Sequence, residues 1–354
     1  MIAFFAIYLI INLSLNLQLG YAGIPNFGLV LAFTGGAYTV GWLPIRLCMW
    51  VFNIDSELGA DIAKNNVIIV SQINSHIQTQ PLIGLAVFIL TLIAAVAVGG
   101  LLGFVSAYPA IRLRTDYLAI TLLALGEVLS IIGQNYDPLV GGVIGILAPD
   151  VWGWSGGSRF AVVSLVLFLA AIGTLLTLDL IARSPISRTF RAIRDNEVAA
   201  SSMGKDVTKV RMEALVIGSM ICSLAGALCA FYTCYVGPAA YGRLEWTFLP
   251  WLMVIFGGLG NNFGVALGTF IFVALQKLIV FYKSSFAFLP FDVVWLEYLL
   301  LGSIILVILV FRPSGLMKEK QSRTMPKTRL EEIAAKVLAK SSKESRASNA
   351  KKNR

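Results

Sequence analysis

Long apolar segments constrain the fold of this chain more than any other feature of its sequence. In a helix that rises 1.5 Å per residue, about 20 apolar residues span the ~30 Å hydrocarbon layer of a bilayer. Hydrophobic residues make up 57 % of the 354 residues and charged residues 13 %, about half the charged share of a soluble protein. The sequence therefore predicts an all-α, polytopic integral membrane protein, and excludes a soluble enzyme, a secreted disulfide scaffold and a disordered chain. The apolar segments lie near residues 1–19, 27–51, 83–108, 117–134, 161–182, 212–236, 247–259, 264–282 and 294–311.

We expect about eight to nine transmembrane helices, some of them broken or re-entrant. The segment 247–259 is only about 13 residues long and ends in a run rich in glycine. Because this is too short for a full span, residues 247–282 are expected to form a broken or re-entrant pair of helices.

The distribution of basic residues predicts the orientation, because cytoplasmic loops of membrane proteins carry an excess of Lys and Arg. Of the 28 Lys and Arg residues, 22 fall at 112–114, at 183–211 and after residue 311. These segments are therefore expected to be cytoplasmic, with the N-terminus and the polar loop 53–82 outside. We expect a multi-pass protein of the cell membrane: a permease domain over residues 1–311 and a basic cytoplasmic tail over 312–354. The tail is expected to be partly helical and partly disordered, and to face anionic lipid rather than nucleic acid.

Glycine clusters within the apolar segments are the first candidates for a translocation path. Glycine permits a helix to unwind where its backbone lines a cavity, but it also permits close packing of helices. Close packing is the more common reason for a single glycine, whereas the clusters at residues 20–28 and 257–264 are the better candidates for broken helices. The candidates are Gly20, Gly23, Gly257 and Gly258.

One acidic residue, Glu127, stands alone inside the segment 117–134. A carboxylate within the membrane is costly, so we expect it to have a partner and to face the protein interior or water. Two roles stay open: lining the path, or joining two helices as a neutral, hydrogen-bonded acid.

The polar loop 183–211 contains start and stop signals for a short helix. Asp195 or Asn196 can cap its N-terminus, Glu197 suits its first turn, and Gly204 can take the left-handed position after its end. About two helical turns are unstable alone, so a partner surface must hold them. One alternative is an amphipathic connector on the lipid surface. Possible apolar anchors are Phe190, Ile193 and Met203.

Residues 197–204 resemble the EAA loop of ABC-importer permeases, which docks in a cleft of the ATPase subunit. More closely, the whole chain resembles the LivM-type permease of branched-chain amino-acid importers. The family usually has further acidic and alanine residues where this chain has Asn196, Ser201 and Ser202. The matching stretches follow the family's order and comprise residues 19–24, 36–38, 112–120, 125–127, 141–146, 191–204, 224–228, 257–260 and 311–316.

The resemblance implies one half of a heteromeric pore in the lipid bilayer. A second, LivH-like permease subunit would complete it, two cytosolic ATP-binding subunits would power it, and an external binding protein would deliver the solute. This chain itself contains no Walker A motif, so it is expected to be a non-enzymatic subunit without catalytic residues, cofactor or metal. By this resemblance the ATPase-coupling residues are Phe190, Arg191, Arg194, Glu197, Ala199, Ala200 and Gly204.

Three alternative functions are weighed against this interpretation. Permeases for urea or short-chain amides share most of the motifs and are the nearest alternative. An ion-coupled secondary transporter would need more intramembrane carboxylates than Glu127 alone. An intramembrane enzyme is disfavoured because the chain has neither an HExxH nor a GxSxG motif, and because its single histidine, His76, lies outside the apolar segments.

Overall fold

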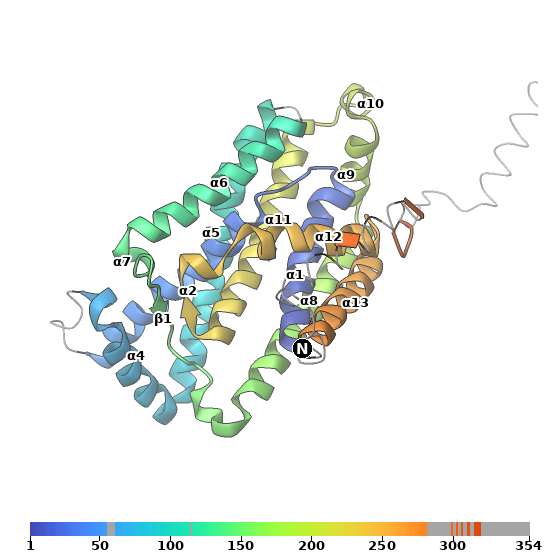
Figure 1. Ribbon diagram of the computed structural model, residues 1–354. Helices are drawn as coiled ribbons and strands as arrows, with labels where there is room; N and C mark the ends of the chain where they lie inside the picture. The colour runs from blue at the N-terminus through green and yellow to red at the C-terminus, as the bar shows by residue number, and fades with distance from the viewer. Residues whose placement is uncertain are drawn as a thin grey trace, which may run out of the picture. The chain divides into compact units, whose positions relative to one another are not determined.

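The computed structural model describes residues 1–54, 61–113, 115–281 and 315–319, with scattered positions between 299 and 311, and only the backbone at 110–112, 115 and 116. Nearly all of this part is helical (Figure 1). The longer helices are α1 (Ile2–Leu15), α2 (Leu29–Phe52), α4 (Ile62–Thr79), α5 (Pro81–Arg112), α6 (Thr115–Asn135), α8 (Arg159–Arg183), α9 (Pro185–Asp195), α11 (Val207–Thr233) and α13 (Asn262–Phe281). The short elements are η1 (Asn16–Tyr21), α7 (Asp137–Val140), β1 (Ile146–Leu147), η2 (Gly153–Ser158), α10 (Glu197–Ser202), β2 (Tyr235–Val236), η3 (Pro238–Ala240), η4 (Leu244–Phe248) and α12 (Leu249–Gly257).

Among the described residues, six helical stretches are long and apolar enough to cross a membrane, and Leu244–Gly257 is a shorter apolar helix. The chain is therefore an all-α polytopic membrane protein, as the sequence predicts. The last predicted segment, 294–311, and the tail beyond residue 319 lie largely outside the described residues, so the count of eight to nine helices stays a prediction. The six stretches are Ile2–Tyr21, Pro81–Pro109, Tyr117–Asn135, Gly153–Arg183, Val207–Thr233 and Asn262–Phe281.

Three helices, α2, α5 and α11, pack against one another along a seam of small residues. A Cβ atom on Gly36 would overlap the carbonyl oxygen of Ser223, and one on Gly226 would overlap the carbonyl oxygen of Phe33. The Ser223 hydroxyl donates a hydrogen bond of 2.6 Å to the carbonyl oxygen of Ala95 on α5. Because lipid supplies no hydrophobic force between helices, this close approach is what holds the seam together.

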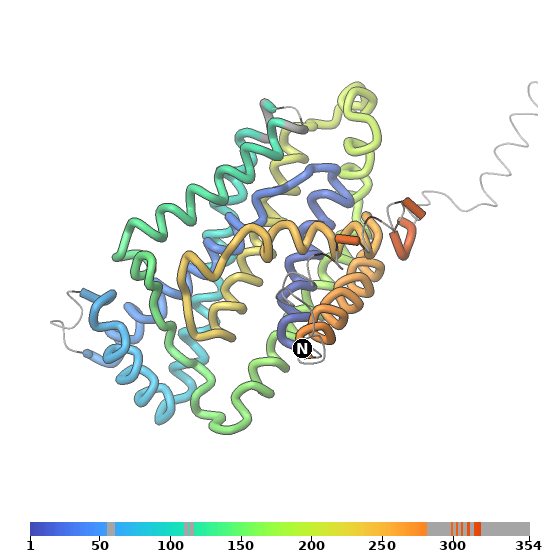
Figure 2. Tube along the Cα trace, viewed as in Figure 1, coloured from blue at the N-terminus to red at the C-terminus, as the bar shows by residue number. Residues whose placement is uncertain are grey.

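Helix α1 is buried among α8, α11, α12 and α13 (Figure 2). Four polar residues at alternate positions, Asn12, Ser14, Asn16 and Gln18, are fully buried in α1 and η1. Asn12 Nδ2 donates to Thr269 Oγ1 at 2.7 Å, and Ser14 Oγ donates to the carbonyl oxygen of Gly218 at 2.7 Å. Buried polar groups are expensive unless paired, so these bonds fix α1 against α13 and α11.

The polar loop 53–82 contains the amphipathic helix α4, which was not predicted from the sequence. Its buried face consists of Asn66, Ile69, Val70, Ile73 and Ile77. The Asn66 side chain donates to the carbonyl oxygen of Leu147 at 3.2 Å and accepts from the amide of the same residue at 2.7 Å. This paired contact fixes α4 to the short strand β1, which itself pairs with β2.

Candidate functional site

Two interruptions of helical structure lie next to each other although they are far apart in sequence. The first break, residues 22–28, follows the π-helix η1, and the second break, residues 258–261, separates α12 from α13. Gly23, Gly258 and Gly260 all have positive φ, with values of 71°, 110° and 74°. A Cβ atom on Gly20 would lie 2.6 Å from the amide nitrogen of Gly260. The glycine clusters therefore mark non-helical backbone. A side chain at residue 20 would collide with the backbone of the second break, so this position requires glycine.

A buried polar junction joins the two breaks. The amide of Gly260 donates to Asn16 Oδ1 at 2.9 Å, and Asn16 Nδ2 donates to Asn262 Oδ1 at 2.9 Å. The Tyr21 hydroxyl donates to the same oxygen of Asn262 at 3.3 Å. The sequence interpretation missed these residues, although polar residues at alternate positions inside the first apolar segment were a signal for such a junction.

Gly257 and Glu127, the other path candidates, occupy different surroundings. Gly257 lies in the α12–α13 contact, where a Cβ atom would be 2.8 Å from Val265 Cα. Glu127 Oε2 lies 3.7 Å from Arg243 Nη1, and both side chains are about half exposed, at 47 % and 52 %. The expected partner of Glu127 is therefore a basic residue, and the pair lies on the surface of this chain.

The elbow, residues 183–211, folds as two short helices between α8 and α11. The Asn196 side chain accepts a hydrogen bond of 3.0 Å from the amide of Ala199, so Asn196 is the N-cap of α10. Gly204 has a φ of 76°, and the amides of Gly204 and Lys205 donate to the carbonyl oxygens of Ser201 and Ala200. These bonds satisfy the last carbonyls of the helix, which confirms the predicted start and stop signals.

The elbow exposes one of the expected apolar anchors and buries the other two. Phe190 is 0 % exposed and Ile193 is 4 % exposed, because α9 turns both side chains into this chain's own core. Phe190 and Ile193 therefore anchor α9 to this chain itself and are not exposed to a partner. Val198 on α10 is 75 % exposed, and Met203, directly after α10, is 82 % exposed. Ala200 is buried, whereas Glu197 is half exposed and pairs with Arg211 at 2.8 Å.

One of the predicted coupling residues, Arg194, contacts two predicted path residues, and a second, Arg191, contacts the neighbouring Tyr21. Arg194 Nη1 donates to the carbonyl oxygen of Gly20, and a Cβ atom on Gly23 would lie 2.6 Å from Arg194 Cγ. The Arg191 guanidinium lies 5.0 Å from the centre of the Tyr21 ring, within the range of a cation–π contact. Helix α9 is thus in direct contact with the first break.

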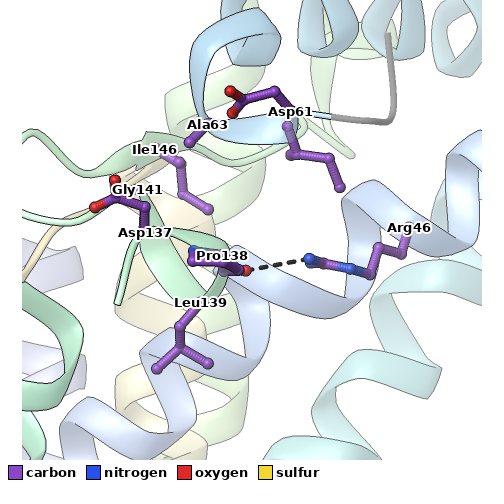
Figure 3. Close-up of a pocket in the computed structure, with 9 residues that line it drawn as sticks. Arg46, Asp61, Ala63, Asp137, Pro138, Leu139, Gly141 and Ile146 are labelled. Atoms are coloured by element: carbon purple, nitrogen blue, oxygen red, sulfur yellow. Dashed lines mark hydrogen bonds between the residues drawn. The ribbon is translucent and has the colours of Figure 1, made fainter. Parts of the chain in front are cut away.

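A small cavity of about 120 Å³ lies between α2, the start of α4 and the segment around α7 (Figure 3). Among the described residues of its lining, Arg46 is the only basic one, beside Asp61 and Asp137. The Arg46 guanidinium donates to the carbonyl oxygens of Pro138 and Trp42, each at 3.1 Å. These bonds join α2 to α7, and none of the described residues that line the cavity belongs to the junction of the breaks.

The bundle of apolar helices, two of them interrupted at a shared polar junction, defines a polytopic membrane protein of the transporter class. A family model described as branched-chain amino acid transport system / permease component matches residues 1–309, and the chain belongs to this family. It is accordingly a transport subunit and not an enzyme.

Relatives cover most of the chain. A probable branched-chain amino acid transport permease protein LivM from Methanocaldococcus jannaschii is 39 % identical, over 94 % of this chain and 96 % of that protein. The high-affinity branched-chain amino acid transport system permease protein LivM of Salmonella typhimurium is 27 % identical, over 88 % of this chain and 68 % of that protein. The autoinducer 2 import system permease protein LsrC of an Enterobacter species is 24 % identical, over 87 % of this chain and 84 % of that protein. No solved structure matches the chain.

Proposed function

We propose that this chain imports branched-chain amino acids as one permease subunit of an ABC importer. Its elbow would bind an ATP-binding subunit and transmit the movement of that subunit to the membrane helices. The observation that carries this proposal is the division of the elbow into an exposed helix, α10, and an amphipathic helix, α9, which packs one face into the core and contacts the first break. Helix α10 is exposed and can bind a partner, while α9 contacts the first break.

The partner surface of the elbow consists of the exposed residues of α10 and the turn after it. Val198 and Met203 offer apolar contact area, and Met adapts easily to the shape of a pocket. Ala199 and Gly204 keep the surface narrow enough for a cleft, and Glu197 adds a carboxylate already held by Arg211. A helix of six residues is unstable alone, so such a partner would also complete its stabilisation.

The transmission step uses α9. Phe190 and Ile193 pack α9 into the core, so a movement of α10 would displace α9 together with the core residues that it contacts. Arg194 would then carry the motion to Gly20 and the first break. The role of Gly20, Gly23, Gly257 and Gly258 in this proposal is to let the backbone rearrange between inward-open and outward-open states.

In the proposed assembly the elbow and the C-terminus are cytoplasmic, because these segments carry most of the basic residues. Two ATP-binding subunits would dock there, a second, LivH-like permease subunit would complete the pore, and a binding protein would deliver the solute on the opposite side. Leucine-like solutes are proposed because a relative that is 39 % identical over 94 % of this chain is named for branched-chain amino acids. Permeases for urea or short-chain amides are the alternative in the same family.

Charged substitutions on the exposed face of the elbow test the docking step. We expect Val198→Glu combined with Met203→Glu to abolish co-purification of the ATP-binding subunits, because apolar contact area would be replaced by buried charge. Val143→Glu, at an equally exposed apolar position outside the elbow, is the matched control and should leave co-purification intact. Retention of the ATP-binding subunits by the double variant would refute the proposed docking surface.

Uptake by a deletion strain tests the solute. The strain complemented with this chain should take up labelled leucine and not labelled urea, and the leucine uptake should require the ATP-binding subunits. Uptake of urea in place of leucine would refute the proposed solute and would support the alternative, a permease for urea or short-chain amides.

A further inference from the structure

Residues 315–319, which follow the last apolar segment, pack onto the second break. The amide of Leu316 donates to the carbonyl oxygen of Phe256 at 2.9 Å, and the amide of Met317 donates to that of Gly257 at 3.1 Å. These two carbonyls belong to the last turn of α12 and would otherwise lack a helical partner. Asn261, within the break, donates its side-chain amide to the carbonyl oxygen of Lys318 at 3.1 Å. We call residues 315–319 the docked segment.

The docked segment ends in Glu319, whose carboxylate faces both arginines of α9. Arg191 Nε lies 2.9 Å from Glu319 Oε1, and Arg194 Nη2 donates to Glu319 Oε2 at 2.9 Å. The three side chains are only 15–28 % exposed. A Cβ atom on Gly260 would lie 2.8 Å from Glu319 Cδ, so the same carboxylate also packs against the second break.

This arrangement makes Arg194 a bridge between the two breaks. One part of its guanidinium binds the carbonyl oxygen of Gly20 beside the first break, and another binds Glu319, which packs on the second. Burial by itself would lower the pKa of the Arg194 guanidinium, but the hydrogen bonds and charges of Glu319 and Asp195 outweigh that effect and raise the pKa. Arg194 therefore stays charged, and the shielded ion pair is stronger than one between fully exposed side chains.

We infer that Glu319 is a positioning residue for transport: it joins α9 to the second break, so that a movement of the elbow displaces both breaks together. The inference rests on the proposed coupling role of the elbow and adds to it a residue 125 positions after Arg194 in the chain. Without Glu319, α9 would still contact the first break through Gly20 but would lose its ionic contact with the docked segment.

Neutralising the carboxylate tests this role in the complete complex, reconstituted in vesicles with its binding protein. Glu319→Gln keeps the size of the side chain and removes the charge. The variant complex should assemble and hydrolyse ATP, while the amount of solute moved per ATP falls at least about fivefold, the lower end of typical coupling between sites. Asp195→Asn is the matched control, because it also removes a carboxylate from Arg194 but one that is 68 % exposed. Its transport per ATP should stay close to wild type.

A reversible cross-link separates positioning from stability. In a chain whose four cysteines are replaced, Glu319→Cys and Arg191→Cys can be joined by a short thiol-specific reagent and released by a reductant. The joined form should couple ATP hydrolysis to transport, and the released form of the same protein should not. A purely structural role would give equal coupling in both forms.

The outcomes decide between the two proposals. Normal coupling in Glu319→Gln, or failure of the cross-link to restore coupling, overturns the role of Glu319 while the elbow proposal stands. Loss of assembly in Glu319→Gln together with equal coupling in the joined and released forms shows an anchoring role only, and also overturns it. Solute uptake by the wild-type complex without ATP-binding subunits would instead refute the proposed function itself.

Discussion

The seam between α2, α5 and α11 yields a prediction whose sign follows from the structure. Substitution of Gly36 by alanine would place a methyl group 2.7 Å from the carbonyl carbon of Ser223 and still closer to its oxygen. These are backbone atoms within α11, which cannot rotate away as a flexible side chain would. The helices must therefore separate locally, and the neighbouring contact of Gly99 with Ser223 would loosen with them.

The magnitude follows from two opposing effects. Adding a methyl group to a well-packed core costs about 1–3 kcal/mol. Alanine in place of glycine in a helix interior gains up to about 1 kcal/mol. Gly173 on α8 gives the reference for the second effect alone, because a Cβ atom there would meet nothing within 4 Å. The difference between Gly36→Ala and Gly173→Ala should thus be the cost of the clash, about 1–3 kcal/mol of unfolding free energy.

Unfolding in mixed detergent micelles measures this difference, with both variants compared with wild type at one protein concentration. Gly173→Ala should match or exceed the stability of wild type, and Gly36→Ala should fall below that of Gly173→Ala. Equal stability of the two variants would show that the seam tolerates a methyl group, and would refute the reasoning that close approach of α2 and α11 holds it together.

Three further predictions concern coupling and the path. Glu197→Lys would break the pair with Arg211 and place two like charges together, so transport per ATP hydrolysed should fall in reconstituted complexes. Gly204→Val forces a β-branched residue into a left-handed conformation at a local cost of about 1–3 kcal/mol; it should uncouple ATPase activity from transport, whereas Gly204→Asn should not. Glu127→Gln should leave assembly intact and lower the transport rate, and loss of assembly would instead assign Glu127 a structural role.

Local signals in the sequence predicted the elbow well. The boundaries of α10 follow from Asn196 and Gly204, because a cap and a left-handed glycine act within a few residues of themselves. The glycine clusters likewise located both breaks, since glycine adopts backbone conformations that other residues avoid.

Long-range pairing could not be predicted in the same way. The apolar side chain of Phe190 marked it as an anchor, but the sequence cannot tell burial in a partner from burial in the chain's own core. Glu319 meets Arg194 across 125 positions, and Asn16 meets Asn262 across 246, so only the folded bundle brings them together. The contact between α4 and β1 is likewise long-range, because Asn66 meets Leu147 across 81 positions.

Uphill solute uptake into vesicles tests the central claim most directly, namely that a separate ATPase moves the breaks through the elbow. Vesicles containing this chain, its partner permease and its ATP-binding subunits should concentrate labelled leucine only when ATP and the binding protein are supplied. Concentration of leucine by the purified chain alone, driven by an ion gradient, would contradict the account.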